Sequence, residues 1–144
     1  MAVWVVYESM HGNTEKIAQA VGKALGSKVK VTRVAEASSS QIKGVDLLVV
    51  GSPTYGGKQT PGVLAFLNSI PAGALKGVRV AAFDTRITWR FLRLFGFAAE
   101  KTLAALVAKG GTRAGEPRGF FVRGSNGPLA DGEIEKAAAW AKGL

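Results

Sequence analysis

Apolar runs alternate with amphipathic segments along this chain of 144 residues, and the alternation predicts its secondary structure. Val3–Tyr7 is a continuous apolar run rich in β-branched and aromatic residues, which is typical of a strand buried on both faces. From Asn13 the apolar residues recur at three- and four-residue steps, which predicts a helix that ends at Gly26. The buried face of this helix would carry Ile17, Ala18, Val21, Ala24 and Leu25.

The same patterns predict the remaining elements. Lys28–Val34 alternates strictly between polar and apolar residues, as an edge strand with one exposed face does. The further strands expected are Asp46–Ser52, Gly77–Thr85 and Arg118–Gly124. The further helices expected are a short one from Ser40, Thr60–Ile70 with Pro61 in its first turn, Phe97–Gly110 and Ala130–Leu144. In the last helix we expect Asp131 as N-cap and, on the buried side, Ile134, Ala137, Ala138 and Ala141.

Strands that alternate with helices indicate a parallel sheet covered on both faces, because parallel strands need crossover connections. The chain contains no internal repeat, low-complexity tract or linker, so one domain is expected over residues 1–144. Open parallel sheets bind ligands beyond the carboxyl ends of their strands, where the strand order reverses. The residues that follow the first, third and fourth strands are therefore the candidates for a site.

Composition removes several classes of function. The chain has no cysteine and one histidine, which excludes disulfides, thiolate nucleophiles and Cys- or His-rich metal sites, and we expect no metal. No apolar stretch approaches the ~20 residues of a membrane span. The N-terminal segment lacks the basic residues of a signal peptide, so we interpret it as a strand and expect a cytoplasmic protein.

The net charge of +9 favours acidic partners, which include nucleic acid, anionic lipid and acidic protein surfaces. The alternative is a generally basic protein whose charge has no partner.

The loop after the first strand passes directly into a helix, whose N-terminal N–H groups and partial positive charge suit a phosphate. Ser9, Asn13 and Thr14 add side-chain donors, and Gly12 allows close approach of the backbone. The same residue types cap helices, and the sequence leaves phosphate binding and capping open.

The loops after the third and fourth strands carry the other candidates. In the segment Gly51–Pro61, Tyr55 offers a flat face, and Gly56 and Gly57 favour a turn. An ordinary loop with a surface tyrosine is the alternative. After the fourth strand, Asp84 and Thr85 have the groups to bond the edge of a ring. Arg86 either binds a ligand or pairs with Asp84, and we favour pairing.

Taken together, the three loops resemble those of flavodoxins, the small FMN-binding electron carriers, and the resemblance runs the length of the chain. The family's phosphate loop reads roughly Ser/Thr-x-Thr-Gly-Asn-Thr, and this chain has Ser9, Met10, His11, Gly12, Asn13 and Thr14 in the same order. The resemblance implies a flavodoxin-like three-layer sandwich, with a five-stranded parallel sheet of order 2-1-3-4-5 and helices on both faces. The short-chain type is expected, because Arg118–Gly124 is not split by an extra segment.

The resemblance also implies a role for each loop. The first would hold the FMN phosphate, and Tyr55 would lie against the isoalloxazine ring. The third loop would contact the other side of the ring and its pyrimidine edge. The cofactor-binding residues expected beyond the first loop are Pro53, Thr54, Tyr55, Gly56, Gly57, Asp84, Thr85 and Arg86.

Four features depart from the family pattern. His11 replaces the usual threonine, and we hypothesise that its protonated form strengthens phosphate binding as the pH falls through ~6.5. Lys58 replaces an acidic residue, and with nearby arginines it would stabilise reduced, anionic flavin. The overall charge is basic, whereas typical flavodoxins are acidic. The segment Ile87–Phe97 is basic and aromatic, so it would suit peripheral membrane contact, a lid, a docking patch or the core.

We therefore predict an FMN-binding electron carrier between a reductase and an acceptor, with redox partner proteins that present acidic docking surfaces. No catalytic acid, base or nucleophile is identified, because the cofactor would supply the chemistry. The alternatives are an FMN-dependent NAD(P)H or quinone reductase, and a flavin-free module that binds an acidic partner. We do not expect nucleic acid to be a partner.

Overall fold

A computed structural model describes residues 1–55, 57–87, 97–124 and 126–144 of the chain. The strands in this part of the chain are β1 (Val3–Tyr7), β2 (Lys30–Arg33), β3 (Leu47–Pro53), β4 (Arg79–Ile87), β5 (Thr112–Arg113) and β6 (Arg118–Val122). The helices are α1 (Asn13–Leu25), α2 (Pro61–Ser69), α3 (Ala98–Ala108) and α4 (Glu133–Lys142), with short 3₁₀ turns η1 (Val34–Glu36) and η2 (Ser39–Ile42).

The strands form one parallel sheet in the order β2-β1-β3-β4-β5, and β6 also pairs with β4. β5 lies beside Arg79 and Val80 at the start of β4, whereas β6 lies beside Phe83–Ile87 at its end. Two segments thus share the fifth position of the sheet. The expected order is confirmed, and the two-residue β5 was missed because it is too short to show a periodicity.

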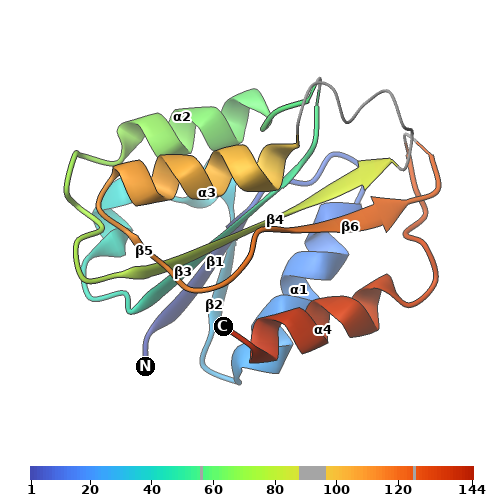
Figure 1. The fold of residues 1–144 in the computed structure, drawn as a ribbon, viewed down its shortest axis with the longest axis horizontal. Helices are drawn as coiled ribbons and strands as arrows, with labels where there is room; N and C mark the ends of the chain where they lie inside the picture. Colours follow the sequence, from blue (N-terminus) through green and yellow to red (C-terminus); the bar gives the residue numbers. More distant parts are fainter. Residues whose placement is uncertain (56, 88–96, 125) are drawn as a thin grey trace.

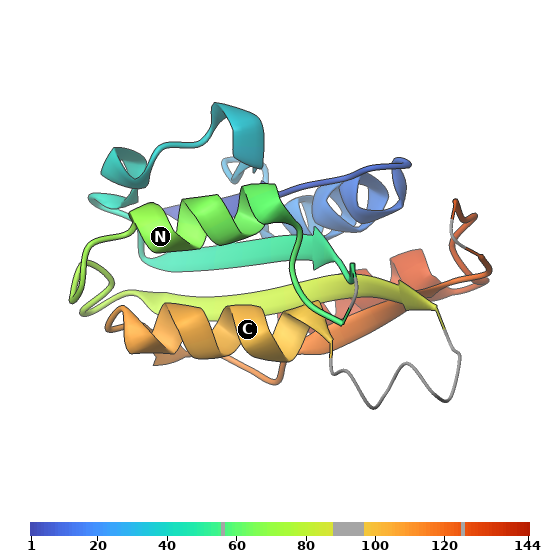
Figure 2. The ribbon, with the colours of Figure 1, turned by 90° about the horizontal axis from the view of Figure 1, so that it is seen from above.

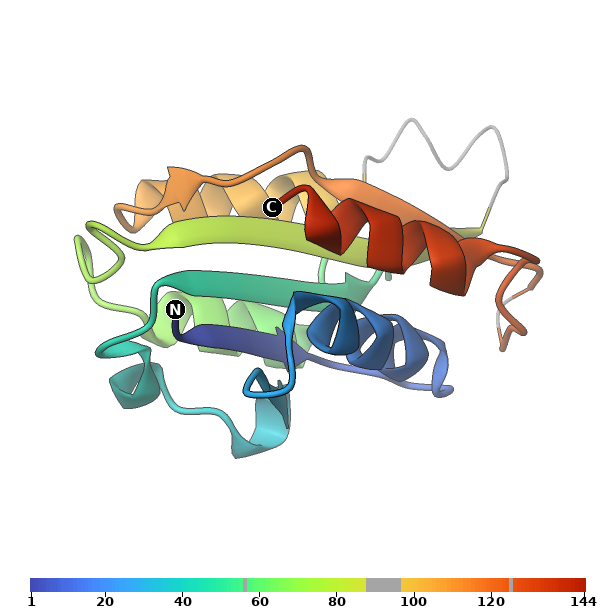
Figure 3. The ribbon, with the colours of Figure 1, turned by 90° about the horizontal axis from the view of Figure 1, so that it is seen from below.

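Helices cover both faces of the sheet, as expected. Figure 1 shows the sheet between α2 and α3 on one side and α1 and α4 on the other. Figure 2 views the molecule from the side of α2 and α3, and Figure 3 views it from the side of α1 and α4. The flavodoxin-like three-layer arrangement is therefore confirmed.

β1 explains why a continuous apolar run is needed at the centre of this sheet. Its side chains alternate between the two faces. Trp4 and Val6 enter the core under α2 and α3, whereas Val3, Val5 and Tyr7 enter the core under α1 and α4. All five residues are buried, because both faces are covered.

The ends of the strands differ from the expectation in a way that affects the site. β3 extends to Pro53 and β4 extends to Ile87, so Pro53, Arg86 and Ile87 lie on strands and not in loops. Backbone pairing to neighbouring strands fixes these positions, since Ser52 lies beside Asp84 and Pro53 beside Thr85.

α4 closes the outer edge of β6. The Glu133 carboxylate accepts a hydrogen bond from the Phe121 N–H at 2.9 Å, and the Ala130 N–H donates to the Phe121 carbonyl at 2.8 Å. The Trp140 indole N–H donates to the Glu116 carbonyl at 3.0 Å. The first two bonds occupy edge groups of β6, and the third joins α4 to the segment between β5 and β6.

The start of α4 corrects two expectations. Gly132 is the N-cap in place of Asp131, which pairs with Arg123 at 2.9 Å instead. Ile134 is 39% exposed, and the inward position is taken by Glu133, which is 3% exposed. The bond from Phe121 accounts for this rotation of the helix, because a buried carboxylate needs a donor. Ala137 and Ala141 are buried, as expected.

Candidate functional site

In the loop between β1 and α1, some backbone N–H groups bond to a capping side chain and others make no hydrogen bond to any residue that the structure describes. The Ser9 Oγ accepts hydrogen bonds from the Gly12 N–H at 3.0 Å and the Glu15 N–H at 3.2 Å, so Ser9 caps the helix from outside it. Gly12 is the N-cap with φ 86°, a conformation that favours glycine. Within the described residues, the N–H groups of Asn13 and Thr14 make no hydrogen bond. This pair of N–H groups is available to an anion.

The side chains of Asn13 and Thr14 point into the protein and join this loop to others. Thr14 Oγ1 lies 2.9 Å from Thr85 Oγ1 on β4, and both residues are buried. Because one hydroxyl donates to the other, the second keeps a hydrogen for a ligand. A Cβ added at Gly127 would come within 2.5 Å of the Asn13 amide, so the loop after β6 packs closely against Asn13.

The segment after β3 presents an exposed aromatic ring on a fixed backbone. Tyr55 is 58% exposed, and its N–H and carbonyl pair with those of Lys58 at 2.8 and 3.2 Å. The Thr54 N–H donates to the Thr85 carbonyl at 2.9 Å, and its hydroxyl accepts the Ala98 N–H of α3 at 3.1 Å. Gly56 lies outside the described residues. The tyrosine ring is thus available for stacking on a segment tied to β4 and α3.

Asp84 and Arg86 form a buried ion pair at the end of β4. Arg86 donates from Nε and Nη2 to the two carboxylate oxygens of Asp84, both at 2.7 Å. The Ala99 N–H donates to Asp84 at 2.8 Å. The guanidinium also stacks on the Phe97 ring at 3.7 Å and lies 3.5 Å from Glu100. Of the two alternatives that the sequence left open for Arg86, the structure has the pairing with Asp84.

The ionisation of this pair follows from its surroundings. Burial raises the pKa of the Asp84 carboxyl, while the Arg86 guanidinium and the Ala99 N–H oppose that rise. Burial alone would lower the pKa of Arg86, but the bonds and charge of Asp84 outweigh it and raise that pKa. The carboxylate of Asp84, with no exposed surface, is fully used within the protein.

One pocket of about 340 Å³ brings most of the candidate residues together at the carboxyl ends of β1, β3 and β4. Its lining residues are Met10, His11, Asn13, Thr14, Pro53, Thr54, Tyr55, Thr85, Arg86, Ile87 and Val122. The candidates Ser9, Gly12, Gly57 and Asp84 are not part of this lining. Val122 was missed because an apolar residue at the end of a strand gives the same signal as a core residue.

Three further expectations concern a membrane span, a metal site and the segment Ile87–Phe97. Of the described helices, none is long and apolar enough to cross a membrane. In the part of the chain that the structure describes, no group of three or more His, Asp or Glu side chains is placed so that it could hold a metal ion. Most of the segment Ile87–Phe97, residues 88–96, lies outside the described residues, and so do its arginines and Trp89.

The fold and pocket together define an α/β sandwich with two N–H groups, unpaired among the described residues, at a helix start and an exposed tyrosine at the switch point of the sheet. A family model described as a flavodoxin domain matches residues 4–93. The chain belongs to this flavodoxin family, whose members bind flavin, usually FMN, and act with redox partners. A comparison with curated protein sequences found no match.

Solved structures agree with this membership at the level of the fold. A short-chain flavodoxin associated with a non-canonical PDU bacterial microcompartment is 22% identical, with a TM-score of 0.82, and the match covers 100% of this chain and 97% of that one. A flavodoxin from Streptococcus pneumoniae is 22% identical with a TM-score of 0.79, at 100% and 97% coverage. Rubredoxin oxygen:oxidoreductase from Desulfovibrio gigas is 22% identical with a TM-score of 0.78, and the match covers 99% of this chain but 35% of that one.

Proposed function

We propose that the chain binds FMN in this pocket and carries electrons between a reductase and an acceptor protein. The observation that carries the proposal is the placement, in one pocket, of unpaired N–H groups at the start of α1 and an exposed tyrosine beside apolar side chains. Anion-binding N–H groups suit a phosphate, and an aromatic face suits a flat ring. Family membership supports the same assignment.

The residues present fit the cofactor. The N–H groups of Asn13 and Thr14 would hold the phosphate, with a hydroxyl hydrogen from the pair Thr14 and Thr85. Tyr55 and the apolar side chains of Met10, Ile87 and Val122 would hold the ring. The pocket volume of about 340 Å³ falls within the ~300–1,000 Å³ typical of small-molecule sites.

Bound FMN supplies the redox chemistry, because it accepts and releases one or two electrons. The protein's residues bind the cofactor, orient its ring and set the charge around it. We assign Ser9 and Gly12 to shaping the helix start, and Asp84 to holding Arg86 and the first turn of α3. In this proposal no side chain acts as a catalytic acid, base or nucleophile.

The partners and setting are also proposed. A net charge of +9 supports redox partners with acidic docking surfaces, because like charges would repel a basic reductase. We propose that residues 1–144 are one domain, since a single sheet takes its strands from Val3 to Val122 and α4 packs beside α1. A cytoplasmic location is part of the same proposal.

Flavin titration tests the proposal directly. The purified protein should quench FMN fluorescence with a stoichiometry of one, and riboflavin, which lacks the phosphate, should bind at least tenfold more weakly. Equal affinity for the two flavins would contradict the phosphate assignment. Failure to bind either flavin would overturn the carrier and favour a flavin-free binding module. Steady oxidation of NAD(P)H by the protein alone would instead favour a reductase.

A further inference from the structure

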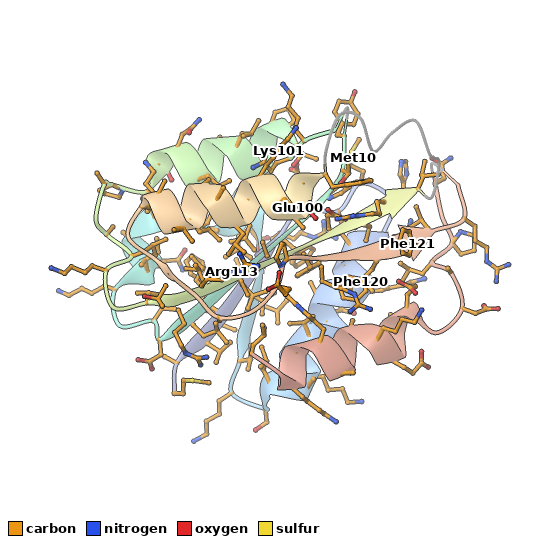
Figure 4. The ribbon with its side chains drawn as sticks, viewed as in Figure 1. Met10, Glu100, Lys101, Arg113, Phe120 and Phe121 are labelled. Atoms are coloured by element: carbon orange, nitrogen blue, oxygen red, sulfur yellow. The ribbon has the colours of Figure 1, made fainter. Side chains whose placement is uncertain are left out.

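The first turn of α3 contacts both segments that face the ring position in the proposed site. Its first two N–H groups are taken by Thr54 and Asp84, at 3.1 and 2.8 Å. Its next two side chains reach back as well, since Glu100 lies 3.5 Å from Arg86 and Lys101 donates to the Gly57 carbonyl at 2.6 Å. Figure 4 shows Glu100 and Lys101 near the N-terminal end of α3.

The bond from Lys101 holds a turn of the segment that carries Tyr55. Gly57 has φ 79°, which residues other than glycine rarely adopt, and it lies inside the pair of backbone bonds between Tyr55 and Lys58. A bond from an ammonium to a carbonyl is charge-assisted and stronger than a neutral bond. Lys101 therefore anchors the peptide beside Tyr55 to a helix 44 residues further along the chain.

The helix itself gives no reason for a lysine at this position. The N-terminal end of a helix carries a partial positive charge, which favours Asp and Glu in the first turn and disfavours Lys. Lys101 is the fourth residue of α3, directly after Glu100. A residue that breaks a local preference beside a candidate site points to a task at that site.

We propose that Lys101 is the positioning residue of the tyrosine segment and places a fixed positive charge beside the flavin ring. The inference rests on the proposed function, since it takes FMN as the ligand. By holding the Gly57 carbonyl, Lys101 keeps the Tyr55 ring in the orientation that receives the flavin. Its charge stabilises the reduced, anionic cofactor relative to the neutral one, which raises the potential for the second electron.

The test uses three substitutions of Lys101 and one matched control. Lys101→Gln removes the charge, Lys101→Arg keeps it, and Lys101→Glu reverses it. Lys109→Gln makes the same charge change at the other end of α3, where a lysine is favoured by the helix. The measurements are the FMN dissociation constant, the two one-electron potentials, the melting temperature, and the amide exchange of Tyr55 and Lys58 in the flavin-free protein.

Lys101→Gln should weaken FMN about tenfold, speed exchange of both amides and leave the melting temperature unchanged or slightly raised. It should also shift the equilibrium for uptake of the second electron about threefold toward the less reduced flavin. This shift lowers the potential of the second step by ~28 mV, at 59 mV per tenfold. Lys101→Arg should restore most of these values, and Lys101→Glu should lower the potential further. Lys109→Gln should lower the melting temperature with no effect on FMN.

The outcomes separate the inference from the function it rests on. Wild-type affinity, exchange and potential in Lys101→Gln would overturn it. Faster amide exchange with an unchanged potential would contradict the electrostatic role of Lys101 and support its positioning role. A wild-type protein that binds no flavin would contradict the proposed function, and amide exchange in the flavin-free protein would still decide whether Lys101 holds the segment.

Discussion

Two helices, α1 and α3, begin beside the same pocket, but the N–H groups at their N-termini differ in whether they are hydrogen-bonded. At α1, Ser9 takes two N–H groups, and those of Asn13 and Thr14 are left without a partner among the described residues. At α3, the first two N–H groups are both satisfied, by Thr54 and Asp84. An anion can bind only where the donors are free. From this comparison we propose that the phosphate binds at α1 and that α3 supports the site.

The largest effect is expected at the closed terminus. Asp84→Ala would leave the guanidinium of Arg86, whose side chain is 12% exposed, without its carboxylate. Loss of one partner of a buried pair should lower the free energy of unfolding by about 3 kcal/mol. Urea unfolding measures the change. The double variant Asp84→Ala, Arg86→Met should recover part of the loss, and a single variant as stable as the wild type would contradict a structural role for the pair.

A smaller loss is expected for the cap of α1. Ser9→Ala removes the acceptor of the Gly12 and Glu15 N–H groups, which should cost about 1 kcal/mol of stability. Thermal unfolding of the flavin-free protein measures it. Because Ser9 bonds to the helix start and does not line the pocket, FMN affinity should change less than stability. The opposite ranking would make Ser9 a direct ligand.

Thr14→Val tests the open terminus through its side chain. The variant loses the hydroxyl shared with Thr85 and should bind FMN about fivefold more weakly, ~1 kcal/mol, with riboflavin unaffected. Thr102→Val is the matched control, because the buried Thr102 hydroxyl has no partner among the described residues. That control should be at least as stable as the wild type. An equal loss for both flavins would remove Thr14 from the phosphate site.

The smallest effect is expected at His11, which is exposed on the lining of the pocket. A positively charged side chain near a phosphate should strengthen binding, so FMN affinity should be about threefold higher at the acid end of the pH range than at the alkaline end. FMN titrations between pH 5.5 and 8 measure this difference. His11→Ala should abolish it, and a pH profile shared by both proteins would leave His11 without a role.

Local patterns were enough to predict most of the strands and helices. The apolar run of β1 and the three-to-four-residue period of α1 are set by burial on neighbouring elements, so the sequence displays them directly. The strand order followed from the resemblance of three loops to a family. Tyr55 lies in the pocket as expected, and its contact with flavin stays a prediction.

Local sequence patterns did not predict the contacts between segments that are far apart in the sequence. Thr14 and Thr85 are 71 residues apart, and Lys101 and Gly57 are 44 apart. Nothing in a single sequence marks such pairs, because each residue is ordinary in its own segment. The inward position of Glu133 shows the same limit, since a glutamate in the first turn of a helix is normally a surface residue.

The closure of the β6 edge by α4 has a consequence for the newly synthesised chain. The ribosome delivers β6 before α4, so the edge N–H of Phe121 stays uncovered until Glu133 at the start of α4 emerges, and the carbonyl of Glu116 stays uncovered until Trp140 emerges. Uncovered strand edges recruit other chains. Premature release before residue 133 would leave this edge open, and such fragments should aggregate even though the candidate flavin site is almost fully encoded upstream.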